Sequence, residues 1–116
     1  MSEVLIVITT LPDRASGERI AEALVTERVA ACVNILAECT SLYTWQGKIE
    51  RSSEVPLLIK TTRSAYPQLE QKLRELHPYQ LPEIIALPVA AGLPDYLNWV
   101  VQETAATEVT EVSKSN

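Results

Sequence analysis

Apolar residues recur along the chain at two different spacings, which divide it into strands and helices. Residues 3–10 form a β-branched apolar run that is typical of a strand buried on both faces. After Pro12, apolar residues three and four positions apart predict a helix from about residue 16 to residue 29, with Ser16 as its N-cap. The chain is therefore expected to open with a strand and an amphipathic helix.

The middle of the chain predicts a long hairpin. A strand from Cys32 to Leu36 is expected to run on through Ser41–Tyr43 and to reverse at Gly47. The second strand then runs from about residue 49 to residue 61. Because proline cannot donate a hydrogen bond to a neighbouring strand, Pro56 predicts a bulge or an edge position there.

The remainder of the chain alternates in the same way. A second helix is predicted after its candidate N-cap Ser64, with Pro67 tolerated in the first turn. A loop over residues 77–83, a strand over 84–89 and a third helix opening at Pro94 follow. Residues 1–104 are expected to form one domain, and the polar tail 105–116 is expected to fray.

This order of elements is βαββαβ with an appended helix, the α+β pattern of a ferredoxin-like sandwich. Such a fold covers only one face of its antiparallel sheet with helices. Yet Ile6 and Ile8 on one side of the first strand are as apolar as Leu5 and Val7 on the other. The second face therefore predicts a partner subunit, and the long hairpin predicts an arm that reaches it. We expect a homo-oligomer.

The composition of the chain disfavours nucleic-acid binding, membrane insertion and zinc binding by cysteines. The 116 residues are 47% hydrophobic and 22% charged, with a net charge of −5 and no basic stripe, which disfavours nucleic-acid partners. The aliphatic run Val4–Ile8 is far shorter than the about 20 residues that span a bilayer, and no basic segment precedes it, so neither a membrane span nor a signal peptide is expected. Cys32 and Cys39 match no zinc spacing and predict reduced thiols in a cytoplasmic protein.

Five segments resemble the CutA family of divalent-cation tolerance proteins. The resemblance runs from about Val4 to about Glu103, and its motifs occur in the order and spacing of the family. The segments are residues 31–35 (ACVNI), 41–49 (SLYTWQGKI), 58–62 (LIKTT), 77–85 (HPYQLPEII) and 96–99 (YLNW).

The resemblance implies the assembly and the role of the protein. It implies a ferredoxin-like subunit in a tight homotrimer, with the sheets facing the threefold axis and strand edges pairing between subunits. It also implies a cytoplasmic protein linked to tolerance of copper and other divalent metals, with no enzymatic reaction. The trimer would be similar to that of the PII signalling proteins.

The resemblance also implies a metal site, of which this chain keeps a part. His77 and Glu83 match the family's proposed ligands, whereas Thr9 stands where the family has a cysteine and Leu76 where a further histidine can occur. Threonine is not a thiolate, so the soft ligand suited to Cu(I) is missing. We expect weak binding of Cu(II) or another divalent cation by His77 and Glu83, with Thr9 and His77 facing one cleft.

Each candidate residue also has a purely structural interpretation. His77 follows a helix and can interact with the C-terminal carbonyls, and Glu83 can accept a backbone hydrogen bond. The aromatic residues Tyr43, Trp45 and Tyr79 are more typical of interface packing than of a ligand cage. Lys60 either pairs with a carboxylate across an inter-subunit cleft or extends to water. Asn34, inside an apolar strand, requires a hydrogen-bond partner.

Three classes of function remain from the sequence. The first is a metal-tolerance protein that binds cations through His77 and Glu83. The second is a PII-like sensor that binds a small anionic effector in an inter-subunit cleft near Lys60, Tyr79 and Glu83, with Asn34 as a further candidate. No glycine-rich phosphate loop is present, which weakens a nucleotide version. The third is a hydrolase on the same fold, which we do not expect because no nucleophile–base pair is evident.

Overall fold

The computed structural model describes residues 3–104, so the predicted tail 105–116 lies outside the described residues. Five strands and three helices follow in the expected order along the chain. They are β1 (Val4–Leu11), α1 (Arg14–Thr26), β2 (Cys32–Ile35), β3 (Cys39–Trp45), β4 (Lys48–Thr62), α2 (Tyr66–Leu76), β5 (Ile85–Pro88) and α3 (Pro94–Thr104).

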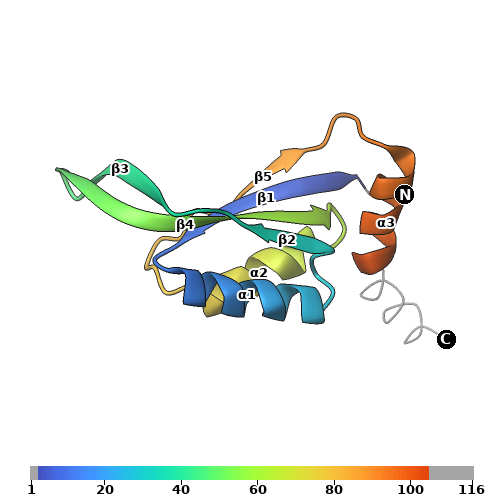
Figure 1. Cartoon of the computed structure of the whole chain (residues 1–116), viewed down its shortest axis with the longest axis horizontal. Coiled ribbons are helices and arrows are strands. Elements are labelled where there is room, and N and C mark those ends of the chain that lie inside the picture. The colour runs from blue at the N-terminus through green and yellow to red at the C-terminus, as the bar shows by residue number, and fades with distance from the viewer. Residues whose placement is uncertain (1–2, 105–116) are drawn as a thin grey trace.

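The strands form one antiparallel sheet in the order β2-β4-β1-β5, with β3 pairing the outer part of β4. Helices α1 and α2 lie against one face of this sheet, and α3 lies at the end opposite the β3–β4 hairpin (Figure 1). The fold is therefore of the expected α+β type, and the described helices leave one face of the sheet uncovered. Among the described helices, none is long and apolar enough to cross a membrane.

The long hairpin is interrupted at Pro56. Strand β2 pairs with β4 as far as Ile35 opposite Leu57, and β3 resumes at Cys39 opposite Glu54. Residues 36–38 thus lie opposite only residues 55–56, which confirms the predicted bulge. On the side of β4 that faces β2 and β3, the Pro56 carbonyl accepts a hydrogen bond from Leu36 N–H (3.0 Å). Because the N and O of one strand residue point the same way, the missing N–H of Pro56 faces the interruption.

The outer part of the hairpin, residues 39–54, projects beyond the helices and is called the arm below (Figure 1). Its strands are joined at Gln46 (φ 51°) and Gly47 (φ 82°). Two consecutive positive φ angles define a tight turn whose twist matches that of the strands, so the expected reversal at Gly47 is confirmed. Leu42 and Ile49 on the arm are 62% and 81% exposed.

Two helix N-caps differ from the predictions. Helix α1 begins at Arg14, and Asp13 rather than Ser16 is its N-cap, since Asp13 Oδ1 accepts from Ser16 N–H (2.7 Å). This hydrogen bond holds the pKa of Asp13 below its usual value. Helix α2 has Ala65 at its N-cap, and the amide of Ala65 donates to Thr62 Oγ1 (3.2 Å). Asp13 is the N-cap of α1 because it lies about one turn before Ser16 and its carboxylate complements the positive end of the helix.

The core lies between the sheet and the two helices. Along β1, alternate side chains from Leu5 to Leu11 point into it and are fully or almost fully buried. Its other buried members come mainly from α1, β4 and α2: Ile20, Leu24, Val29, Ala30, Leu57, Ile59, Leu69 and Leu73. A smaller cluster of Val4, Ala31 and Val100 attaches α3 to the end of the sheet.

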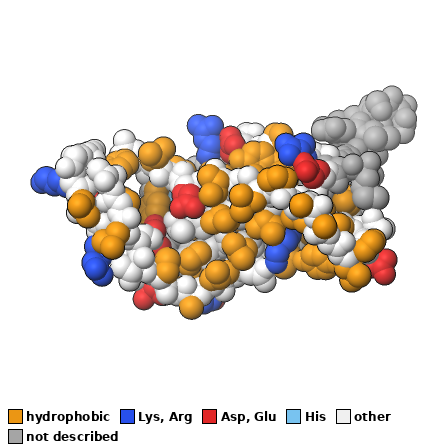
Figure 2. All heavy atoms as spheres, turned by 90° about the horizontal axis from the view of Figure 1, so that it is seen from above, with side chains coloured by type: hydrophobic (Ala, Val, Ile, Leu, Met, Phe, Trp, Pro, Cys, Tyr) orange, Lys and Arg blue, Asp and Glu red, His pale blue; other side chains and the backbone are white. Residues whose placement is uncertain are grey.

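The other face of the sheet is apolar but has no covering element among residues 3–104. Its side chains form rows across the strands, with Ile8 between Leu58 and Ile85, and Ile6 between Lys60 and Leu87. Figure 2 shows hydrophobic side chains spread over this face. Ile85 and Leu87 are each 49% exposed. We call the surface made by Ile6, Ile8, Leu58, Ile85 and Leu87 the open face.

Thr9 is the exception in the buried row of β1. Its side chain has no exposed surface, and in the described part of the chain its Oγ1 has no hydrogen-bond partner. The expectation that Thr9 shares a cleft with His77 is therefore wrong, because Thr9 points into the core beside Val7 and Leu11. A buried hydroxyl without a partner lowers the free energy of unfolding.

Replacing this hydroxyl by a methyl group is expected to stabilise the protein. Thr9→Val should raise the free energy of unfolding by about 1 kcal/mol in urea titrations, since it removes an unpaired polar atom at constant volume. The matched control is Thr61→Val, because Thr61 is equally buried but donates to the Val29 carbonyl (2.7 Å). The control should be destabilised, and equal effects of the two substitutions would contradict the assignment.

Candidate functional site

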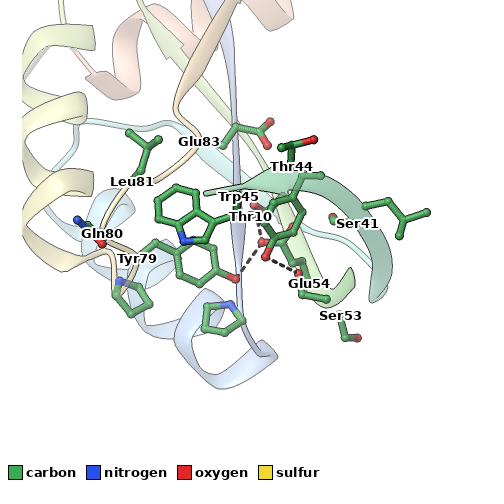
Figure 3. A pocket seen from close by; sticks show the side chains of 15 residues that line it. Thr10, Ser41, Thr44, Trp45, Ser53, Glu54, Tyr79, Gln80, Leu81 and Glu83 are labelled. Atoms are coloured by element: carbon green, nitrogen blue, oxygen red, sulfur yellow. Dashed lines mark hydrogen bonds between the residues drawn. The ribbon is translucent and has the colours of Figure 1, made fainter. Parts of the chain in front are cut away.

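A pocket of about 920 Å³ lies where the arm meets the loop after α2. Figure 3 shows its lining, with Glu54 and Tyr79 joined by a hydrogen bond and with Trp45 and Glu83 bordering the same space. The lining residues come from the end of β1, both strands of the arm and the loop: Thr10, Pro12, Ser41, Leu42, Tyr43, Thr44, Trp45, Ser52, Ser53, Glu54, Pro78, Tyr79, Gln80, Leu81 and Glu83.

Glu54 is the central polar group of this pocket. It stands on β4 next to the interruption at Pro56 and is only 8% exposed. Its Oε2 accepts hydrogen bonds from Tyr79 OH (2.9 Å) and from Thr10 Oγ1 (3.1 Å). Burial and this hydrogen bond raise the pKa of the Tyr79 phenol well above its usual value, so Tyr79 stays protonated and acts as a donor.

His77 lies behind the pocket and is held by hydrogen bonds at both ring nitrogens. Tyr79 N–H donates to its Nδ1 (3.2 Å), so the proton of the neutral ring is on Nε2, which donates to the Thr10 carbonyl (2.9 Å). Its side chain is 8% exposed, and burial lowers its pKa below 6.5 although Thr10 and Glu54 act in the opposite direction. The ring thus anchors the loop to β1 instead of bonding to helix carbonyls.

The two predicted metal ligands, His77 and Glu83, do not line the same pocket. Glu83 lines the pocket, whereas His77 does not. Across residues 3–104, no three His, Cys, Asp or Glu side chains gather where they could hold a metal ion. Since the one lone pair of the His77 ring already accepts from Tyr79, the ring would have to give up that bond to bind a metal. Metal ligation by His77 and Glu83 stays a prediction.

The other predicted site residues separate into two groups. Tyr43, Trp45 and Tyr79 come together in the pocket. Lys60 and Asn34 lie elsewhere, on β4 and β2, where Lys60 Nζ donates to Asn34 Oδ1. Asn34 thus has the partner that its position required. Lys60 makes no ion pair among the described residues.

Sequence reasoning missed Glu54 and Thr10. One signal was present for Glu54, because it is the last charged residue before the apolar run that begins at Val55. The contact with Tyr79 joins positions 25 apart in sequence, and the contact with Thr10 joins positions 44 apart. No local pattern encodes such distances. The contact with Thr10 depends on the pairing of β1 with β4, and the contact with Tyr79 depends on the position of the loop after α2.

The family whose model matches residues 5–103 is described as "CutA1 divalent ion tolerance protein". The chain belongs to this family. The CutA resemblance of the five sequence motifs is thereby confirmed.

The CutA1 relatives are similar over most of this chain. The divalent-cation tolerance protein CutA of Thermus thermophilus is 48% identical over 99 residues, covering 85% of this chain and 96% of the relative. Protein CutA of Mus musculus is 50% identical over 95 residues, which are 82% of this chain but 54% of the mouse protein. The crystal structure of CutA from Xylella fastidiosa superposes with a TM-score of 0.86 at 48% identity, covering 89% of this chain and 99% of that one.

The buried ring of His77 should make stability depend on pH. The unfolded chain takes up a proton near pH 6.5, whereas the folded ring does so only at lower pH. The contribution of His77 to the free energy of unfolding is therefore largest above pH 6.5. It should decrease as the pH falls from 6.5 toward the pKa of the folded protein. His77 is the chain's single histidine, so urea titrations from pH 7.5 to 5.5 isolate this effect.

The comparison variant is His77→Gln, which cannot titrate in this range. Its overall stability should be lower, since the bonds to Thr10 and Tyr79 change, but its free energy of unfolding should vary less between pH 7.5 and 5.5. Parallel pH profiles for the two proteins, measured at one protein concentration, would contradict this account.

Proposed function

We propose that this chain is the ferredoxin-like subunit of a cytoplasmic homotrimer that serves divalent-cation tolerance by binding and catalyses no reaction. Membership of the CutA1 family supports the tolerance role, since several relatives carry that name. The strand order β2-β4-β1-β5 is the one expected for a ferredoxin-like sheet. The two cysteines, Cys32 and Cys39, are both free, as in proteins of a reducing compartment.

The observation that carries the proposed assembly is the open face. Both of its β5 members are about half exposed in a single chain, and they continue a row of apolar residues on β1 and β4. A contiguous apolar surface of this kind is typical of a subunit interface. The exposed Leu42 and Ile49 extend the apolar surface along the arm, as expected if the arm contacts a neighbour.

The proposed cation binding is weak and uses one imidazole and one carboxylate, those of His77 and Glu83. Two protein ligands leave most coordination positions to water, unlike the three or four ligands of a tight site. Imidazole suits Cu(II) and Zn(II), and Cu(II) ranks first in the Irving–Williams order. Thr9 supplies no thiolate, and its burial leaves it outside any such site.

The alternative of a PII-like sensor for an anionic effector finds less support. It placed the effector in an inter-subunit cleft near Lys60, Tyr79, Asn34 and Glu83. Within one subunit, Tyr79 and Glu83 line the pocket, whereas Lys60 and Asn34 do not. Lys60 instead donates to Asn34 on the sheet. The described lining of the pocket within one subunit contains no Lys or Arg, so an anionic effector would need a cation from a second copy of the chain.

Trimerisation predicts a matched pair of variants. Light scattering at micromolar concentration should give about three times 12.9 kDa for the wild type. Ile85→Glu should lower this mass, since each buried isoleucine contributes about 1.5–3 kcal/mol and the charge would face apolar neighbours. Val25→Glu on α1 is the control, because Val25 is 43% exposed on the helix side and should leave the trimer intact.

A native monomer in the wild type would disprove the proposed assembly. An Ile85→Glu variant that remains as trimeric and as resistant to dilution as Val25→Glu would show that the open face is not the interface.

Metal binding is tested by calorimetry. Cu(II) should bind weakly to the wild type, with affinity nearly constant from pH 7.5 to 6.5 and falling below, since the ring must be neutral to bind. His77→Ala should abolish this binding, and Glu83→Gln should weaken it. Glu22→Gln, an exposed substitution on α1, should change nothing. Binding that survives His77→Ala would place the site elsewhere.

A further inference from the structure

The pocket at the base of the arm contains Glu83, one of the two proposed metal ligands, and a second carboxylate, Glu54, that the proposed metal site does not use. Among the described residues that line it, the charged side chains are Glu54 and Glu83, and no Lys, Arg or His is present. A pocket with two carboxylates and no cation attracts a positively charged guest and repels an anion. This pattern is opposite to that of an anionic effector site.

Glu54 has no cationic partner although it is nearly buried. The groups that donate to it are the neutral hydroxyls of Tyr79 and Thr10, and both donate to the same oxygen, Oε2. No ion pair within residues 3–104 includes Glu54 or Glu83. A nearly buried carboxylate is stabilised further by a positive charge nearby, and no described ion pair supplies one to Glu54.

The remaining walls of the pocket indicate what kind of cation fits. Tyr43, Trp45 and Tyr79 line it with aromatic rings, and Figure 3 shows Trp45 and Tyr79 beside the two carboxylates. Ammonium and guanidinium groups bind well against such rings, tryptophan best of all. Metal ions of the Mg²⁺ or Ca²⁺ type need several oxygen ligands and gain little from an indole. The aromatic lining therefore favours an organic cation.

We propose that this pocket binds a small organic cation, an ammonium or guanidinium group carried on a short alkyl chain. The charged group lies against Glu54 and Glu83, and the alkyl chain packs on Trp45 and Tyr79. The volume of about 920 Å³ lies within the range of about 300–1,000 Å³ that is usual for small-molecule pockets. The proposal does not depend on metal binding by His77, which lies outside the lining.

The test uses four probes of matched size in the intact protein: butylammonium, butylguanidinium, butanol and butyrate. Trp99→Phe removes the indole on α3, so that fluorescence reports on Trp45 alone. At constant ionic strength, both cations should change the Trp45 emission with saturation. Butanol should bind at least tenfold more weakly, and butyrate should not bind.

Two variants and one control assign the binding to the carboxylates. Glu54→Gln keeps an acceptor for Tyr79 and Thr10 but removes the charge, and it should weaken binding of the cations at least tenfold, as should Glu83→Gln. Glu22→Gln removes one exposed charge from α1 and should leave binding unchanged. Circular dichroism and light scattering verify that each variant keeps the fold and the assembly of the wild type.

Several results would overturn the proposal. They are equal binding of butanol and butylammonium, unchanged affinity in both Glu54→Gln and Glu83→Gln, and no binding by fluorescence or by ligand-observed NMR. The last result is also expected if a basic side chain of a second copy fills the pocket. Cu(II) calorimetry with His77→Ala is a separate measurement, so failure of amine binding and failure of metal binding are told apart.

Discussion

The central constraint on this molecule is that one strand, β4, pairs with three others. Its 15 residues pair with β1 along their inner half, with β2 on the other side of that half, and with β3 along the outer half. Pro56 marks the position at which β2 gives way to β3, because it has no N–H to offer there. The inner half of β4 thus belongs to the core and the outer half to the arm. Glu54 stands at the junction, and the pocket forms around it.

The same strand explains why the subunit has two unlike faces. Residues 55, 57 and 59 of β4 are buried against the helices, whereas Leu58 lies among the apolar residues of the open face. Within residues 3–104 no further element covers that side, so the free energy that burial of its apolar side chains would contribute is available to a partner surface. The proposed assembly and the subunit fold would thus both rest on this one sheet.

A series of hydrogen bonds connects the end of α2, β1, β4 and the loop after α2 near the pocket. His77 at the end of α2 donates to the backbone of Thr10, whose hydroxyl donates to Glu54, which also accepts from Tyr79. These contacts fix the loop after α2 against the end of β1 and the base of the arm. In this series, the structural role of His77 competes with its proposed role as a metal ligand. The ring of His77 is occupied by the loop that it holds, whereas the carboxylate of Glu54 has one oxygen to which no described residue donates.

The sequence by itself determined the order of the elements, the turn at Gly47, the bulge at Pro56 and the family, because each rests on neighbouring residues or on motif spacing. It also indicated that both sides of β1 are apolar, which is a property of alternation alone. Only the tertiary structure decided which candidates meet: Tyr79 with Glu54, Lys60 with Asn34, and Thr9 with the core instead of a cleft. These outcomes depend on strand register and on loop closure between positions far apart in the chain. A shift of one residue in the pairing of a strand would turn its side chains, such as that of Thr9 on β1, to the opposite face of the sheet.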